Sequence, residues 1–143
     1  MAAPAKDKLS VLVVEDEKAI RDLLKFVLSN RYELEFHSVD SAQALKEFMA
    51  TPKFKDIHIA FVDNSLEGEG SHNGTGHASI PEMLKANPRL GVIAMSGSSE
   101  RRTQAEEEFK VPFLPKPFYP QEAVGLVEKH RREMAKKHHE AMA

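Results

Sequence analysis

The fold is decided by a β-branched run that leads directly into three acidic residues, Leu9-Ser-Val-Leu-Val-Val-Glu-Asp-Glu17. The apolar part is typical of a strand that is buried on both faces, as in a parallel sheet. Between Glu17 and Asn30, apolar residues then recur every three or four positions, at Ile20, Leu23, Leu24, Val27 and Leu28. This spacing predicts a helix with one apolar face. The sequence therefore opens with a buried strand, an acidic turn and an amphipathic helix.

The same alternation continues along the rest of the chain. We predict further strands at 32–37, 57–62, 90–95 and 111–114, and further helices at 42–50, 79–86, 98–109 and from 121 onward. Asp40 or Ser41 fits as the cap of the second helix, and Ser98 or Ser99 as the cap of the fourth. Strands that alternate with helices predict parallel β-α-β crossovers, and hence an α/β fold with a doubly wound five-stranded sheet and helices on both faces.

Composition limits the class of protein. The 143 residues are 41% hydrophobic and 29% charged, which is typical of one folded domain. We expect a flexible tail at 1–7, the domain at 8–133, and a polar tail at 134–143 that frays. The net charge of −2 argues against direct nucleic-acid binding, and the absence of cysteine excludes disulfides and thiolate zinc sites. With neither a signal peptide nor a membrane span, we expect a cytoplasmic protein.

Polar residues gather where the predicted strands end. They are Glu15, Asp16 and Glu17 after the first strand, Asp63, Asn64 and Ser65 after the third, Ser96 after the fourth and Lys116 after the fifth. Taken singly, each fits a turn, a helix cap or a solvated charge. The carboxyl ends of parallel strands meet at one edge, however, where clustered carboxylates repel one another unless a cation compensates. Carboxylates, Mg²⁺ and a lysine are the groups that phosphoryl transfer to a carboxylate requires.

Four motifs at these strand ends resemble the receiver domain of bacterial response regulators. They are Val11-Leu-Val-Val-Glu-Asp-Glu17, Ala60-Phe-Val-Asp63, Ala94-Met-Ser96-Gly97 and Phe113-Leu-Pro-Lys116-Pro117-Phe118. They occur in the family's order, and the resemblance covers residues 8 to 133. It implies a flavodoxin-like strand order of 2-1-3-4-5 and a single-domain regulator of a two-component or phosphorelay system.

The resemblance also implies which residues bind the phosphoryl group and the metal. Asp63 would accept the phosphoryl group from a histidine kinase or a histidine phosphotransfer protein. Asp16, Asp63 and the backbone carbonyl of Ser65 would bind Mg²⁺ or Mn²⁺, with Glu15 contributing through water. Such a domain accepts a phosphoryl group and hydrolyses it slowly, and it is not a dedicated enzyme.

Three further residues match the family's switch. Ser96 resembles the hydroxyl that closes on the phosphoryl group, and Phe113 the aromatic side chain that rotates with it. Lys116 resembles the lysine that pairs with the phosphate, and its bond to Pro117 would be cis. The predicted helix at 98–109 has few apolar anchors, so we expect it to shift easily. Together with the fifth strand and fifth helix it would bind a downstream protein, and the sequence leaves open a homodimer formed through this face.

The sequence departs from the family in two places. The acidic pair is Glu15-Asp16, where the family most often has two aspartates. The segment from Asn64 to Gly76 is longer than the family's and lacks its Met-Pro pair, and its role cannot be read from the sequence. It carries Glu67 and Glu69, which we expect to point into water.

Other functions fit the residues less well. The acidic turn after the first strand would repel a flavin phosphate, the glycine-rich loop lacks a Walker ending, and a Ser rather than a second Asp stands two positions after Asp63. We expect His72, His77, His138 and His139 to be solvated rather than zinc ligands. One alternative stays open, a phosphorylation-independent pseudo-receiver that acts as a protein-interaction module.

Overall fold

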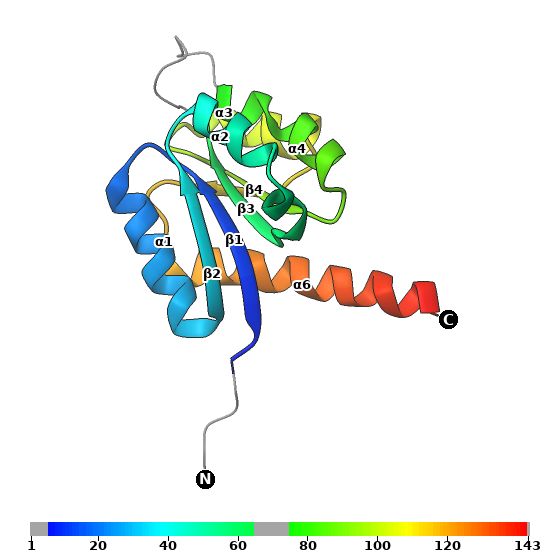
Figure 1. The fold of residues 1–143 in the computed structure, drawn as a ribbon. Helices are drawn as coiled ribbons and strands as arrows, with labels where there is room; N and C mark the ends of the chain where they lie inside the picture. Colours follow the sequence, from blue (N-terminus) through cyan, green and yellow to red (C-terminus); the bar gives the residue numbers. More distant parts are fainter. Residues whose placement is uncertain (1–5, 65–74, 143) are drawn as a thin grey trace.

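The computed structural model describes residues 6–64 and 75–142 (Figure 1). The described residues form a parallel five-stranded sheet in the order β2-β1-β3-β4-β5, which confirms the predicted fold class and strand order. The strands are β1 (Lys8–Val14), β2 (Glu33–Val39), β3 (Ile59–Asp63), β4 (Gly91–Ser96) and β5 (Phe113–Pro115).

Helices cover both faces of the sheet. They are α1 (Lys18–Arg31), α2 (Ala42–Met49), α3 (Thr75–Ala78), α4 (Ile80–Ala86), α5 (Glu100–Thr103) and α6 (Pro120–Met142), with a 3₁₀ turn η1 (Pro52–Asp56) and a π-helical turn η2 (Gln104–Glu108). The side chains of α1 and α6 pack against one face, and those of α2, η1, α4 and η2 against the other.

Successive side chains of the central strands point to opposite faces of the sheet and so contribute to two core layers. On β1, Leu12 and Val14 face the α2 and α4 side, whereas Val11 and Val13 face the α1 and α6 side. All four side chains are buried, as expected for a strand covered on both faces. Because β3 and the last four residues of β1 are buried, the residues that follow these strands are held on a rigid scaffold.

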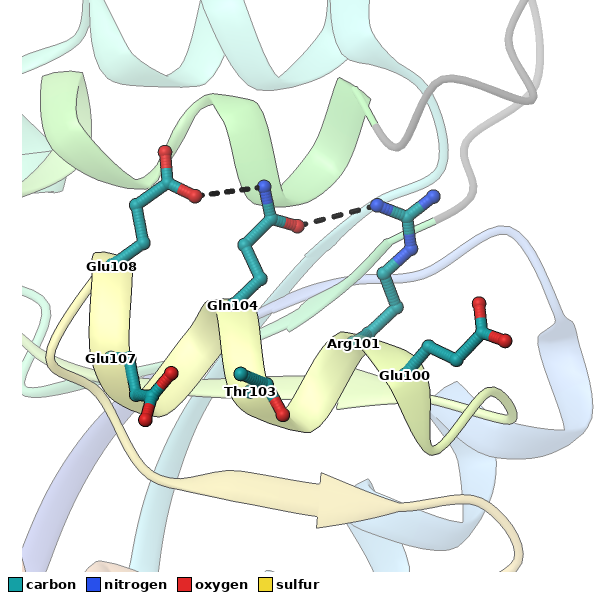
Figure 2. A pocket seen from close by; sticks show the side chains of 6 residues that line it. All are labelled: Glu100, Arg101, Thr103, Gln104, Glu107 and Glu108. Carbon is teal, nitrogen blue, oxygen red and sulfur yellow. Dashed lines mark hydrogen bonds between the residues drawn. The ribbon is translucent and has the colours of Figure 1, made fainter.

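The predicted fourth helix is divided in two. After α5 the backbone widens into η2, where the N–H of Phe109 donates to the carbonyl of Gln104, five residues earlier. Figure 2 shows the outer surface of this segment, where Gln104 is hydrogen-bonded to Arg101 at 3.3 Å and to Glu108 at 3.1 Å. Short π-helical turns frequently occur at functional sites.

Two helix caps give different outcomes. The hydroxyl of Ser41 accepts from the N–H of Ala44 at 3.1 Å, so Ser41 rather than Asp40 caps α2. The prediction that Ser98 or Ser99 caps the fourth helix is confirmed in position only, because Ser99 is the N-cap residue of α5. Ser99 makes no side-chain cap bond, and the N–H of Ser98 donates instead to the Ser96 hydroxyl.

The prediction that the C-terminal tail frays is also wrong, because α6 continues to Met142. After Met134 every described residue is exposed, so this part of the helix is polar and solvated but helical. Long straight-chain residues with good helix propensity explain the continuation. Among the described helices, none is both long enough and apolar enough to cross a membrane.

Candidate functional site

The carboxyl ends of β1 and β3 bring three carboxylates together. Glu15 and Asp16 follow β1, and Asp63 ends β3, which pairs directly with β1. One carboxylate oxygen from each residue lies within 4.8 Å of the other two. Glu15 is 0% exposed and Asp63 4%, whereas Asp16 is half-buried. The predicted convergence of these three residues is confirmed.

Lys116 supplies the positive charge of this cluster. It follows β5, and its Nζ lies 3.0 Å from Asp63 Oδ1 and 3.1 Å from Glu15 Oε2. The peptide bond between Lys116 and Pro117 is cis, as the family resemblance implied. The lysine thus bridges carboxylates from the ends of two different strands.

The two buried carboxylates of the cluster have raised pKa values, and burial is the largest cause. Burial, and then the charge of Asp63, raise the pKa of Glu15 to about 7, although Lys116 opposes this. Burial also raises the pKa of Asp63 against the hydrogen bond from Lys116. Burial alone would lower the pKa of Lys116, but its bonds to the two carboxylates raise it overall. A further cation would therefore be favoured here.

The donor set fits a hard divalent cation. Carboxylate oxygens that converge from several elements are the ligands that Mg²⁺ and Mn²⁺ prefer. Ser65, whose carbonyl is the remaining predicted protein ligand, lies outside the described residues, as do Glu67 and Glu69. Glu15 already accepts bonds from Lys116 Nζ and, at 3.2 Å, from the N–H of Glu17. Its water-mediated metal contact stays a prediction.

Ser96 and Phe113 lie on the neighbouring strands. Ser96 ends β4 and is buried, and its hydroxyl accepts from the N–H of Ser98 at 3.0 Å. Phe113 begins β5, is buried, and has the guanidinium of Arg102 5.2 Å from its ring centre. Both residues are thus near the segment formed by α5 and η2. Their roles as moving parts of a switch stay predictions.

His77 is a site residue that the sequence reasoning missed. We expected a solvated loop histidine, but its side chain is buried, with Nε2 3.1 Å from the carbonyl oxygen of Val62 and 3.0 Å from that of Met95. A signal was present in the sequence, because His77, Ile80 and Met83 recur at three-residue spacing on one apolar face. Because histidine is polar, we did not count His77 among the apolar residues of this face.

The fold and the site together define a class of protein. An open parallel sheet with acidic residues and a lysine at its carboxyl edge defines an α/β protein whose candidate site lies at the strand ends. The family model of the response regulator receiver domain matches residues 11–128. The chain therefore belongs to the response regulator receiver domain family. A comparison with curated proteins finds no match.

Solved structures show the same fold at low sequence identity. The response regulatory domain of mrkE from Klebsiella pneumoniae has a TM-score of 0.71 at 14% identity and covers 90% of this chain and 99% of its own. A receiver domain protein from Clostridium thermocellum has a TM-score of 0.70 at 19% identity, covering 89% and 98%. A response regulator from Burkholderia pseudomallei, solved with a phosphorylated aspartic acid and a calcium ion, has a TM-score of 0.68 at 17% identity, covering 90% and 72%.

Proposed function

We propose that this receiver domain accepts a phosphoryl group on Asp63 from a histidine kinase or a histidine phosphotransfer protein. One observation carries the proposal: the buried Asp63 carboxylate lies 3.0 Å from Lys116 Nζ, within a cluster of carboxylates from a second strand. A nucleophilic carboxylate, a point positive charge and a hard-cation donor set are what an aspartyl phosphate requires.

The transfer forms a bond between an Asp63 oxygen and phosphorus as the bond from phosphorus to the donor histidine nitrogen breaks. Asp16 and Asp63, with the Ser65 carbonyl and with Glu15 through water, would hold Mg²⁺ or Mn²⁺, which offsets the charge of the phosphoryl oxygens. Lys116 is positioned to pair with one of these oxygens as it exchanges its contact with Asp63. The protein thus serves as the acceptor, and slow hydrolysis of the acyl phosphate resets it.

The switch would run from Ser96 to the surface. A Ser96 hydroxyl that donates to the phosphoryl oxygen pulls on the start of α5, because it now accepts from the N–H of Ser98. Charge-assisted hydrogen bonds contribute about 1.5–3 kcal/mol each, enough to change a two-state equilibrium by about tenfold or more.

The surface that responds would be formed by α5, η2, β5 and α6, where a downstream protein binds. A groove on this side is lined by Arg102, Phe113 and Leu126 among others. Phe113 and Arg102 are in contact, so rotation of this aromatic ring would alter the groove directly. This links the site to the proposed partner surface.

The test is the intact mass of the protein after incubation with acetyl phosphate or phosphoramidate, with and without Mg²⁺. We expect one phosphoryl adduct that requires Mg²⁺ and is lost in Asp63→Asn. Asp56→Asn, at an exposed position at the end of η1, is the matched control and should be phosphorylated like the wild type. Absence of an adduct on the wild type would contradict the proposal and favour a phosphorylation-independent interaction module.

A further inference from the structure

We propose that His77 is a positioning residue that fixes the phosphoacceptor strand and the switch-hydroxyl strand relative to each other. The inference rests on the function proposed above. His77 Nε2 lies 3.1 Å from the Val62 carbonyl oxygen and 3.0 Å from the Met95 carbonyl oxygen. Val62 directly precedes Asp63, and Met95 directly precedes Ser96. A single imidazole therefore bridges the backbone immediately before both site residues.

The chemistry of the two partners defines the form of the ring. Carbonyl oxygens only accept hydrogen bonds, so Nε2 must carry the hydrogen and share it between them. The His77 side chain is only 1% exposed, and burial lowers its pKa, with the charge of Arg101 acting in the same direction. The geometry thus requires a hydrogen on Nε2 of the bridging ring. A leucine of similar size would fill the space but donate nothing.

Backbone contacts of Gly76, the residue before His77, independently place this part of the chain against the carboxyl end of β3. The N–H of Gly76 donates to the carbonyl of Asn64 at 3.1 Å, and a Cβ at Gly76 would overlap with the carbonyl oxygen of Asp63. The N–H of Asn64 donates in turn to the Met95 carbonyl at 3.2 Å. Gly76 permits the close approach, and His77 uses it to reach across β3 to β4.

This bridge has a direct consequence for phosphoryl transfer. Asp63 must hold its nucleophilic oxygen in line with the donor while Ser96 approaches the same phosphoryl group from the adjacent strand. Displacement of a reacting group by about 1 Å can cost about a hundredfold in rate. His77 restrains this displacement without touching the phosphoryl group, so we expect its loss to slow phosphorylation while metal binding by Asp16 and Asp63 persists.

The experiment compares His77→Leu, His77→Gln and His130→Leu with the wild type. Glutamine places an amide donor at about the reach of Nε2, so it should restore the bridge in part. His130 is the control, because its ring packs against Gly91 at the opposite end of β4. The readouts are the rate of phosphorylation by acetyl phosphate, the Mg²⁺ affinity, and the amide resonances of Asp63 and Ser96.

We expect His77→Leu to slow phosphorylation about tenfold, with Mg²⁺ affinity within about twofold of wild type and with displaced Asp63 and Ser96 resonances. His77→Gln should recover much of the rate, and His130→Leu should change neither the rate nor these resonances. A wild-type rate and unmoved resonances in His77→Leu would overturn the proposal. So would equal losses of rate in the Leu and Gln variants.

Two outcomes separate this proposal from the function on which it rests. If the wild type takes no phosphoryl group, the proposed function fails, and the Asp63 and Ser96 resonances of His77→Leu alone decide the positioning role. If His77→Leu does not fold, the imidazole nitrogen resonances of the wild type decide it. Hydrogen on Nε2 with a hydrogen-bonded shift supports the bridge, whereas hydrogen on Nδ1 alone overturns it.

Discussion

Charged side chains are paired differently at the two ends of the sheet. At the carboxyl end, Lys116 faces two buried carboxylates, and the pKa values of both are raised. At the amino end, Arg131 lies 3.4 Å from Asp7, donates to the Lys8 carbonyl at 3.3 Å and covers the ring of Tyr32. The Tyr32 hydroxyl in turn donates to Glu128, which also lies near Arg131.

The two ends of the sheet therefore differ in how completely their charged side chains are paired. The amino end pairs its charges locally and joins β1, α1 and α6. Among the described residues, the carboxyl end has three clustered carboxylates around Lys116, so a bound cation would offset the remaining negative charge. The predictions that follow test this contrast, first at the carboxyl end and then at the amino end.

The largest effect is expected for Asp16→Ala. Asp16 is the half-buried member of the carboxylate cluster, and its removal takes away a proposed ligand oxygen. We expect Mg²⁺ affinity to fall about a hundredfold or more in a calorimetric titration. Asp7→Ala, at the amino end, should bind Mg²⁺ like the wild type. Wild-type affinity in Asp16→Ala would refute the metal assignment.

A second, smaller effect is expected for the stability of Glu15→Gln. The pKa of Glu15 is raised from 4.5 to about 7, so the folded state disfavours its charged form. The wild type therefore loses stability relative to the variant as the pH rises from about 4.5 to about 7. Above that range we expect Glu15→Gln to be more stable by about 2 kcal/mol in urea unfolding with EDTA present.

The pH dependence is the informative part of this comparison. The advantage of Glu15→Gln should vanish well below pH 4.5, where the carboxyl is protonated in both the folded and the unfolded state. Glu33→Gln, an exposed position at the amino end of β2, is the control for the loss of a carboxylate outside the cluster. A constant difference in the free energy of unfolding between Glu15→Gln and wild type across this range would contradict the raised pKa of Glu15.

How far the sequence predicts this arrangement depends on the kind of contact. The buried runs before Glu15 and Asp63 predict the sheet, and the strand ends predict the carboxylate cluster and Lys116, because parallel strands bring their carboxyl ends to one edge. The longer Glu15 was expected to act through water. Its contact with Lys116 follows from side-chain reach, which a pattern of residue types does not contain. The burial of His77 was not predicted, because its contacts with the carbonyls of Val62 and Met95 arise from the tertiary structure.

Helix ends were the least predictable feature. The hydroxyl of Ser96, at the end of β4, accepts from the N–H of Ser98, whereas Ser99 at the N-cap position of α5 makes no side-chain cap bond. The length of α6 was underestimated because apolar periodicity ends near Met134, whereas helix propensity continues. The contacts of Arg131 with Asp7 and Lys8 join sequence positions more than a hundred residues apart and leave no local pattern.

The smallest effect is expected at the amino end. Arg131→Ala removes a partly exposed ion pair and a cation–π contact, so we expect a loss of about 1 kcal/mol in the free energy of unfolding that shrinks at high salt. Phosphorylation of this variant should match the wild type. A slower reaction would show that the two ends of the sheet are coupled, contrary to the contrast drawn above.

The most direct test of the phosphoryl-binding site is a titration with beryllofluoride and Mg²⁺, which mimic an acyl phosphate, followed by amide resonances. In the wild type, the account predicts large shifts at Ser96 and Lys116 that extend into α5, with none at Arg131. Lys116→Ala should keep Mg²⁺ binding but lose the shifts in α5. Unmoved Ser96 and Lys116 resonances in the wild type at saturating Mg²⁺, or full α5 shifts in Lys116→Ala, would contradict it.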